Sequence, residues 1–273
     1  MKLCAFWYGG PLSYLEQLCL ASAIDVGHTV DLWTYDPVDG VPKGVIQRDA
    51  REVMPENLLI KSTVSDNAQW GFAVSADIFR TRLLQQERGC YIDCDVLLLK
   101  PIAEEDNIFG WETASSINNA VLRLPPNSPI IAGIHALAAS RPVAPPWWRR
   151  SKKLNQWGRW VQGRDYRFGD RGIPRSTLGP EALTYFAKRH GLAGNAKPIN
   201  VFYPVPHPRV TDLFDPSADL TGITDDTVGV HLWNSQIKLA RFVAPIEGSF
   251  VAAQCKRLKI FDPRWRWDVA RVA

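Results

Sequence analysis

The sequence predicts an α/β fold in which helices flank a mostly parallel central sheet. Its 273 residues are 46% hydrophobic and 22% charged, which is the composition of an ordinary globular protein. The N-terminal elements alternate strand, helix and strand, and a later helix leads directly into another buried strand. This order is typical of parallel α/β sheets, and the length suits one such domain with an appendage.

Local signals define the first three elements. Residues 3–8 predict a short buried strand that ends at the glycines following it. Ser13 and Glu16 form a capping box, so we expect a helix that begins there and ends at Gly27. Residues 29–35 are rich in β-branched and aromatic side chains and predict the second strand.

The following elements lead to a pair of aspartates. After a short strand at residues 45–46, we expect a helix from an N-cap at Ser75 to a stop at Gly89. Residues 90–92 and 96–99 are two halves of one apolar strand pattern. The pattern further predicts a helix over residues 180–190 and a strand over residues 228–233.

Asp93 and Asp95 interrupt this apolar pattern. A bare D-x-D pattern arises by chance in a chain of this composition, so only its context carries information. An unpartnered carboxylate in an apolar strand costs several kcal/mol. The two aspartates therefore either face solvent at a strand end or bind a divalent metal at the edge where α/β sheets hold ligands.

Asp77, Arg80 and His231 are further candidates. Asp77 and Arg80 lie three residues apart on one helix face, where they form either an ion pair or a ligand site. Asp77 is expected in the first helical turn, which favours a carboxylate, and a guanidinium suits phosphate oxygens. His231 follows an apolar run and is either a core histidine or a metal ligand.

These segments resemble the DXD sugar-binding region of glycosyltransferase family 32, which includes α1,4-galactosyltransferases and yeast-type initiating mannosyltransferases. Residues 75–80, 89–96 and 100–101 carry the resemblance, which extends over most of the chain. Cys90 stands where the family usually has a second glycine. Supporting matches are Phe6-Trp7 with Gly9-Gly10, Asn118-Asn119-Ala120, residues 179–184 and residues 231–235.

The resemblance implies a GT-A fold and a metal-dependent, configuration-retaining transfer of a hexose. UDP-galactose or UDP-glucose is the expected donor, and a glycan or glycolipid is the expected acceptor. The expected cofactor is Mn²⁺, with Mg²⁺ as the alternative. Asp93 would bind ribose or donor-sugar hydroxyls, Asp95 and His231 would hold the metal, and Asp77 and Arg80 would hold the donor sugar and diphosphate.

The resemblance also implies a set of donor-binding residues. Phe6 and Trp7 would form the floor under the nucleobase, and Asn119 would lie near the transferred sugar. Trp233 and Asn234 would close over the diphosphate.

The net charge of +4 is concentrated in two segments. Residues 141–175 hold ten Lys or Arg, two Asp and four Trp, and residues 255–273 are a basic, aromatic tail. We expect a single GT-A domain over residues 1–254, with residues 141–175 as an insertion or lid. The patches at Trp147 to Trp160 and Trp265 to Trp267 would suit acceptor capture or docking on an anionic membrane surface.

Two other functions fit parts of the same sequence. The Asp93 and Asp95 pattern also resembles the nucleophile loop of haloacid-dehalogenase-type phosphatases, with Asp225-Asp226 as a later acidic pair. That motif normally follows the first strand, whereas here it follows a later helix. Residues 141–175 would also suit single-stranded nucleic acid, but that function leaves the aspartates without a role, so we expect no nucleic-acid partner.

The cysteines and the hydropathy pattern indicate the cellular compartment. The five cysteines show no C-x-x-C spacing and predict buried, reduced thiols without a zinc site. No apolar run approaches the roughly 18 residues of a spanning helix, and no signal-peptide pattern is visible. We therefore expect a cytoplasmic protein, which the basic patches described above would allow to dock on the inner face of the membrane.

Overall fold

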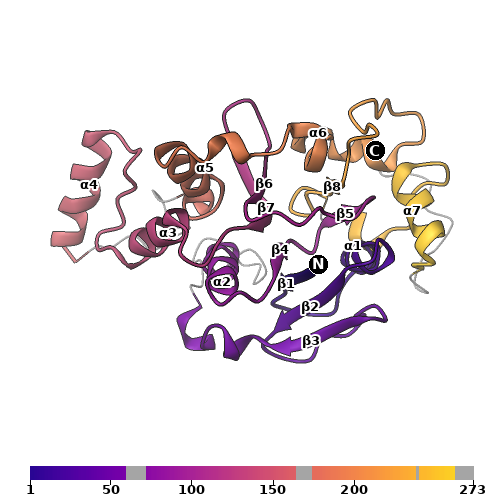
Figure 1. Ribbon diagram of the computed structural model, residues 1–273, viewed down its shortest axis with the longest axis horizontal. Coiled ribbons are helices and arrows are strands. Elements are labelled where there is room, and N and C mark those ends of the chain that lie inside the picture. Colours follow the sequence, from indigo (N-terminus) through magenta and orange to yellow (C-terminus); the bar gives the residue numbers. More distant parts are fainter. Residues whose placement is uncertain (60–71, 164–173, 238–239, 262–273) are drawn as a thin grey trace. The chain divides into compact units, whose positions relative to one another are not determined.

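The computed structural model describes residues 1–59, 72–163, 174–237 and 240–261 (Figure 1). Its strands form a six-stranded sheet in the order β3-β2-β1-β4-β7-β6 and a two-stranded sheet of β5 and β8. Helices precede or follow most of these strands. The predicted α/β class is confirmed, and the architecture is consistent with a GT-A fold.

The chain forms two compact units. The first comprises Met1–Arg48, Ile92–Glu104 and Lys197–Ala273, and the second comprises Asp49–Tyr91 and Glu105–Ala196. The elements mainly of the first unit are β1 (Lys2–Phe6), α1 (Tyr14–Asp25), β2 (Thr29–Thr34), β3 (Val45–Asp49), β5 (Val96–Leu98), α6 (Ile199–Phe202), η6 (His207–Phe214), β8 (Gly229–His231), η7 (Ala240–Phe242) and α7 (Phe250–Leu258). Those mainly of the second are η1 (Ala50–Glu52), η2 (Glu56–Leu58), α2 (Ala73–Gln85), β4 (Cys90–Ile92), β6 (Ile108–Trp111), β7 (Ile117–Arg123), α3 (Pro129–Ala139), α4 (Arg150–Val161), η4 (Arg175–Thr177), α5 (Pro180–Arg189) and η5 (Ala193–Asn195).

The first unit begins with the predicted strand, helix and strand. β1 and β2 pair in parallel, and α1 is the crossover between them. The capping box is confirmed, because the Ser13 side chain accepts a backbone N–H of the first turn and the Glu16 side chain accepts the backbone N–H of Ser13. Helix α1 packs on β5 and α7. β5 in turn pairs antiparallel with β8, so that Val96 lies opposite His231.

The second unit is built around an antiparallel pair of strands. β6 and β7 pair with an irregularity between Ile108 and Gly110, and α5 packs on both β7 and α3. A buried cluster joins α2, α3 and the segments before α4 and α5; its members are Val74, Leu137, Val143, Trp148 and Leu178. Part of the basic segment 141–175 therefore contributes to a hydrophobic core.

The start of α2 differs from the prediction. The helix begins at Ala73, its N-cap is Phe72 without a side-chain hydrogen bond, and Ser75 is buried inside it. Val74 packs in the cluster described above, so tertiary burial extends the helix beyond the local capping signal. Asp77 consequently lies outside the first turn, and the expected benefit of a carboxylate at that position does not apply.

Three further sequence expectations concern the cysteines, the tail and the membrane. All five cysteines are buried, as predicted. The expected tail begins inside α7, and its Trp265 to Trp267 patch lies outside the described residues. Among the described residues, no helix combines the length and apolar character needed to span a bilayer.

Candidate active site

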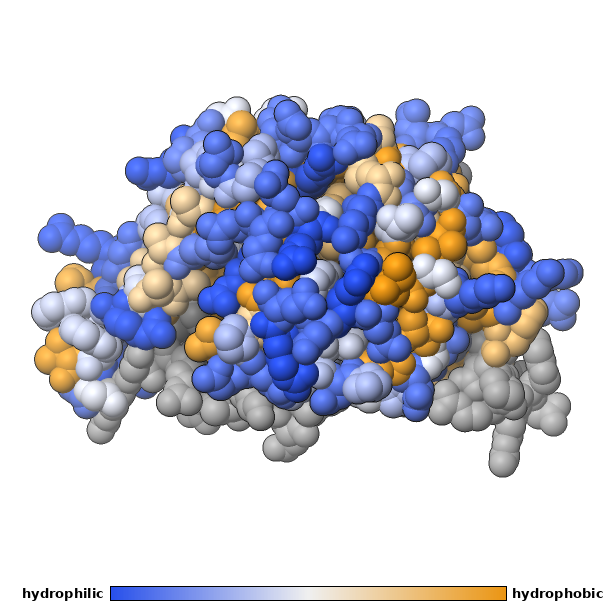
Figure 2. Space-filling view, turned by 60° about the horizontal axis from the view of Figure 1, so that its bottom comes forward, coloured by the Kyte–Doolittle hydropathy of each residue, from blue (hydrophilic) through white to orange (hydrophobic). Residues whose placement is uncertain are grey.

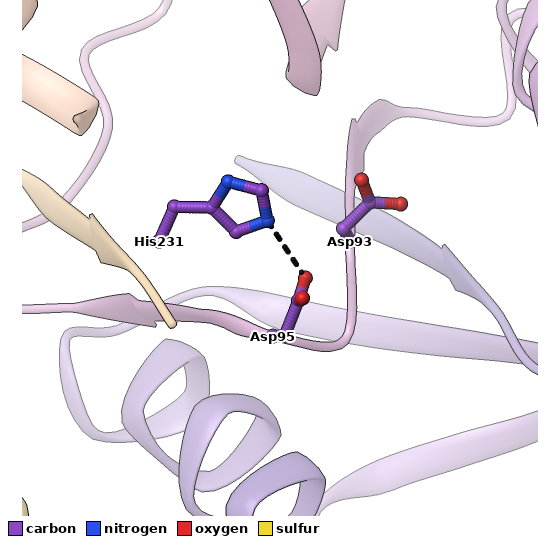
Figure 3. A group of neighbouring side chains, drawn as sticks. All are labelled: Asp93, Asp95 and His231. Carbon is purple, nitrogen blue, oxygen red and sulfur yellow. Dashed lines mark hydrogen bonds and ion pairs between the residues drawn. The ribbon is translucent and has the colours of Figure 1, made fainter. Parts of the chain in front are cut away.

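Asp93, Asp95 and His231 converge in the first unit. The two aspartates lie in the turn between β4 and β5, and His231 ends β8. One potential ligand atom from each residue lies within 4.8 Å of the other two. Figure 3 shows the His231 ring and the Asp93 carboxylate on either side of Asp95. The antiparallel pairing of β5 with β8 brings these distant positions together.

Asp95 is held in place by the segment that follows β8. His231 Nε2 lies 3.1 Å from Asp95 Oδ1, and the backbone N–H of Asn234 donates to Oδ2 at 3.0 Å. Leu232 also donates its backbone N–H to the backbone oxygen of Asp95. Trp233 adopts a φ of +48°, a left-handed conformation that is uncommon for a residue with a side chain. This turn allows the N–H of Asn234 to reach the carboxylate.

The surroundings of Asp95 keep it ionised. Burial alone would raise the pKa of Asp95, but the charge and hydrogen bond of His231, together with the N–H of Asn234, outweigh that effect. The pKa of the carboxyl group therefore lies below its ordinary value of 3.8. An ionised carboxylate is the form that binds cations.

The donor set fits a divalent cation. Two carboxylates and an imidazole supply mixed oxygen and nitrogen ligands, a set that suits manganese better than magnesium or calcium. Asp93, Asp95 and His231 are therefore the residues that would hold the ion.

Glu16 connects the helix α1 to the segment that holds Asp95. Its Oε1 accepts from Asn234 Nδ2 at 2.6 Å and lies 3.0 Å from Arg241 Nη2. Its Oε2 accepts from the backbone N–H of Ser13 at 2.8 Å and from the Ser13 hydroxyl. Glu16 is fully buried, and its carboxylate is an acceptor for all four of these donors.

The C-terminal end of β1 presents aromatic rings in the same unit. Phe6 contacts Tyr35 edge to face, with ring centroids 6.1 Å apart. The guanidinium of Arg241 lies 5.7 Å from the centre of the Trp7 ring. Cys94, which stands between the two aspartates, contacts the backbone oxygen of Phe6 through its sulfur at 3.6 Å. The predicted nucleobase floor thus adjoins the aspartate turn.

Trp233 is buried next to His231. Its indole N–H donates to the backbone oxygen of Val205 at 3.1 Å, and its ring centroid lies 4.0 Å from that of His231. Its observed contacts fix the orientation of His231, while the expected contact with a diphosphate is untested.

Asp77, Arg80 and Asn119 form a second buried polar group, in the second unit. Arg80 Nη2 lies 3.5 Å from Asp77 Oδ1, which also accepts from Asn119 Nδ2 at 2.8 Å. Arg80 Nη1 donates to the backbone oxygen of Asn119 at 2.6 Å, and its guanidinium lies 4.5 Å from the centre of the Tyr91 ring. The ion pair, which the sequence offered as an alternative to a ligand site, is present and is part of a larger network.

Gly179 makes room for this network, which yields a testable prediction. A Cβ at residue 179 would lie 2.7 Å from both carboxylate oxygens of Asp77, and these oxygens are held by Asn119 and Arg80. We expect Gly179→Ala to lower the free energy of unfolding by about 1–3 kcal/mol, because overpacking forces the network apart. Chemical denaturation measures this loss. Gly194→Ala is the control, since its Cβ would meet no atom within 4 Å; equal stability of both variants would contradict the prediction.

The ten predicted site residues thus divide between the units, and two contributors were missed. Phe6, Trp7, Asp93, Asp95, His231, Trp233 and Asn234 lie in the first unit, and Asp77, Arg80 and Asn119 lie in the second. Glu16 was predicted only as a helix cap, and Arg241 was not predicted at all. Only a long-range contact reveals their role, and no local pattern in the sequence indicates it.

Comparison with known families gives a match in the C-terminal part of the chain. A family model described as the alpha 1,4-glycosyltransferase conserved region matches residues 193–259. The matched segment contains His231, Asn234 and Arg241 and does not include the aspartate turn. No match is found among curated proteins. The family match confirms the resemblance to glycosyltransferase family 32 and supports the assignment of this chain to the glycosyltransferases.

Proposed function

We propose that this glycosyltransferase is metal-dependent and moves a hexose from a nucleotide sugar, UDP-galactose or UDP-glucose, to a glycan or glycolipid acceptor with retention of configuration. The observation that carries the metal dependence is the group of Asp93, Asp95 and His231, whose ligand atoms lie within 4.8 Å of one another. The donor, the acceptor and the retention follow from the family resemblance.

The residues of the first unit have distinct roles in this proposal. Asp95 and His231 hold a divalent cation, most simply Mn²⁺, and Asp93 binds it or a hydroxyl of the donor. A bound cation would stabilise the negative charge that develops on the departing nucleoside diphosphate. Phe6 and Trp7 form an apolar surface for the nucleobase. Asn234 and Arg241 both contact Glu16. Their N–H groups would donate hydrogen bonds to the phosphate oxygens of the donor.

The buried network of the second unit is assigned by resemblance to the sugar side of the donor. Asp77 and Arg80 would orient the donor sugar, and Asn119 would fix the Asp77 carboxylate through the hydrogen bond observed here. The phosphatase alternative receives no support from the fold, because the aspartates follow β4 and not the first strand.

Slow hydrolysis of the donor tests this function without knowledge of the acceptor. The full chain is incubated with UDP-galactose, UDP-glucose, UDP-N-acetylglucosamine or GDP-mannose, in Mn²⁺, in Mg²⁺ or in a chelator. We expect at least one UDP-hexose to release UDP, fastest in Mn²⁺, and no release in the chelator. Equal release in the chelator would refute the metal dependence, and no release from any donor would refute the proposed donor class.

A further inference from the structure

Helix α4 exposes its apolar side chains to solvent. Leu154 is 62% exposed, Trp157 56% and Val161 61%. Their spacing of three and four residues places them on one face of the helix. The residue that α4 does bury is Gln156, a polar one. A helix of a globular protein normally turns its apolar face inward, so the orientation of α4 is inverted.

The segment that precedes α4 is packed into the second unit. Trp148 is buried in the core cluster of the second unit, and the indole N–H of Trp147 donates to Glu181 at 2.9 Å. Of the four tryptophans in the predicted patch, only Trp157 and Trp160 are therefore exposed. Their ring centroids lie 6.3 Å apart, so the two exposed indoles lie next to each other.

The charged residues of α4 and the residue before it are all positive. Residues 149–161 contain five Lys or Arg and no acidic residue. Arg149 and Arg150 are exposed at the start of the helix, and α4 has no acidic residue in its first turn. Cations at the N-terminal end of a helix are unfavourable in water, and bound anionic groups relieve this repulsion. In Figure 2, hydrophobic and strongly hydrophilic atoms lie side by side at the left of the view, where Figure 1 places α4.

We propose that α4 docks the protein on an anionic membrane surface. Trp157, Leu154 and Val161 insert into the boundary between headgroups and acyl chains, while Arg149 and Arg150 contact anionic headgroups. Exposed apolar residues on one helix face beside basic residues are the pattern of interfacial helices. The aliphatic Leu154 and Val161 offer no ring for stacking with bases, and a symmetric contact between two copies would bring like charges together.

Vesicle binding of the full chain tests the proposal without any nucleotide sugar, so the result is independent of the proposed reaction. Vesicles of phosphatidylcholine alone are compared with vesicles that contain phosphatidylglycerol in equal part. We expect cosedimentation only with the anionic vesicles. Leu154→Ser combined with Trp157→Ser should weaken binding by at least about tenfold, and Arg150→Gln by about fivefold. The matched controls are Ile246→Ser and Lys43→Gln, at exposed positions outside α4.

Each alternative gives a different result. Unchanged vesicle binding in the α4 variants, or an equal loss in the control variants, overturns the proposal. So does binding to phosphatidylcholine vesicles that matches binding to anionic ones. Analytical ultracentrifugation tests for a dimer. If the wild-type protein is a dimer and the Leu154 and Trp157 substitutions dissociate it, the surface binds a second copy of the chain. If the protein binds a generic single-stranded oligonucleotide more tightly than the anionic vesicles, and the same substitutions abolish that binding, the surface binds nucleic acid.

Discussion

Replacing Asp95 by asparagine is expected to lower metal-dependent donor hydrolysis by about a hundredfold to a thousandfold, which corresponds to roughly 3–4 kcal/mol of transition-state stabilisation. The asparagine side chain retains the size of the aspartate but loses its negative charge. The backbone N–H of Asn234 donates to Asp95 Oδ2 in the native protein. If the amide nitrogen of the new asparagine took the place of Oδ2, two hydrogen-bond donors would face each other. The substitution therefore removes a cation ligand and also loosens the segment that carries Asn234.

Two measurements distinguish this expectation from simple unfolding. Release of UDP is assayed at a temperature at which circular dichroism shows the variant to be folded, and Mn²⁺ binding is followed by electron paramagnetic resonance. The matched control is Asp106→Asn, which removes a carboxylate at an exposed position and should leave both readouts unchanged. A folded Asp95→Asn variant with wild-type Mn²⁺ affinity and wild-type hydrolysis would eliminate Asp95 as a ligand.

The sequence predicts those features of the molecule that depend on interactions between neighbouring residues. The capping box of Ser13 and Glu16 satisfies backbone donors within one helical turn, so it can be read from four neighbouring residues. The interruption of an apolar strand by Asp93 and Asp95 likewise indicates a site, because buried carboxylates need compensation. His231 could be added only through the family resemblance, since a single histidine beside a strand has no local signature.

Tertiary packing determines what the sequence could not predict. Helix α2 begins two residues before the expected cap because Val74 is buried against residues of other segments. Trp147 turns inward because Glu181, 34 positions later, accepts its N–H. Glu16 and Asn234 are 218 positions apart. In each case the partner is distant in sequence, so neither periodicity nor capping signals contain the information.

Among these contacts between residues far apart in the sequence, those of Glu16 have the largest expected effect on stability. All four of its contacts are donors: the N–H and hydroxyl of Ser13, the amide of Asn234 and the guanidinium of Arg241. A carboxylate offers acceptors only, so it satisfies all of them. We expect Glu16→Ala to lower the free energy of unfolding by about 3–5 kcal/mol, because the substitution removes the buried carboxylate that pairs with the Arg241 guanidinium and accepts from Ser13 and Asn234. The melting temperature should fall by about 10 °C.

The chemical reason for this loss is tested by comparing variants of the same pair. Glu16→Gln keeps the volume but turns an amide N–H toward a donor, so it should also destabilise. Adding Arg241→Met to Glu16→Gln also removes the guanidinium that pairs with residue 16. The double variant should therefore lose less free energy of unfolding than the sum of the losses of the two single variants. Glu56→Ala is the control, because Glu56 pairs with Arg51 at 2.9 Å on the exposed surface, where such a pair contributes at most about 1 kcal/mol. Additive losses in the Glu16 and Arg241 variants would show that the two side chains act separately, and that Glu16 serves only as the cap of α1.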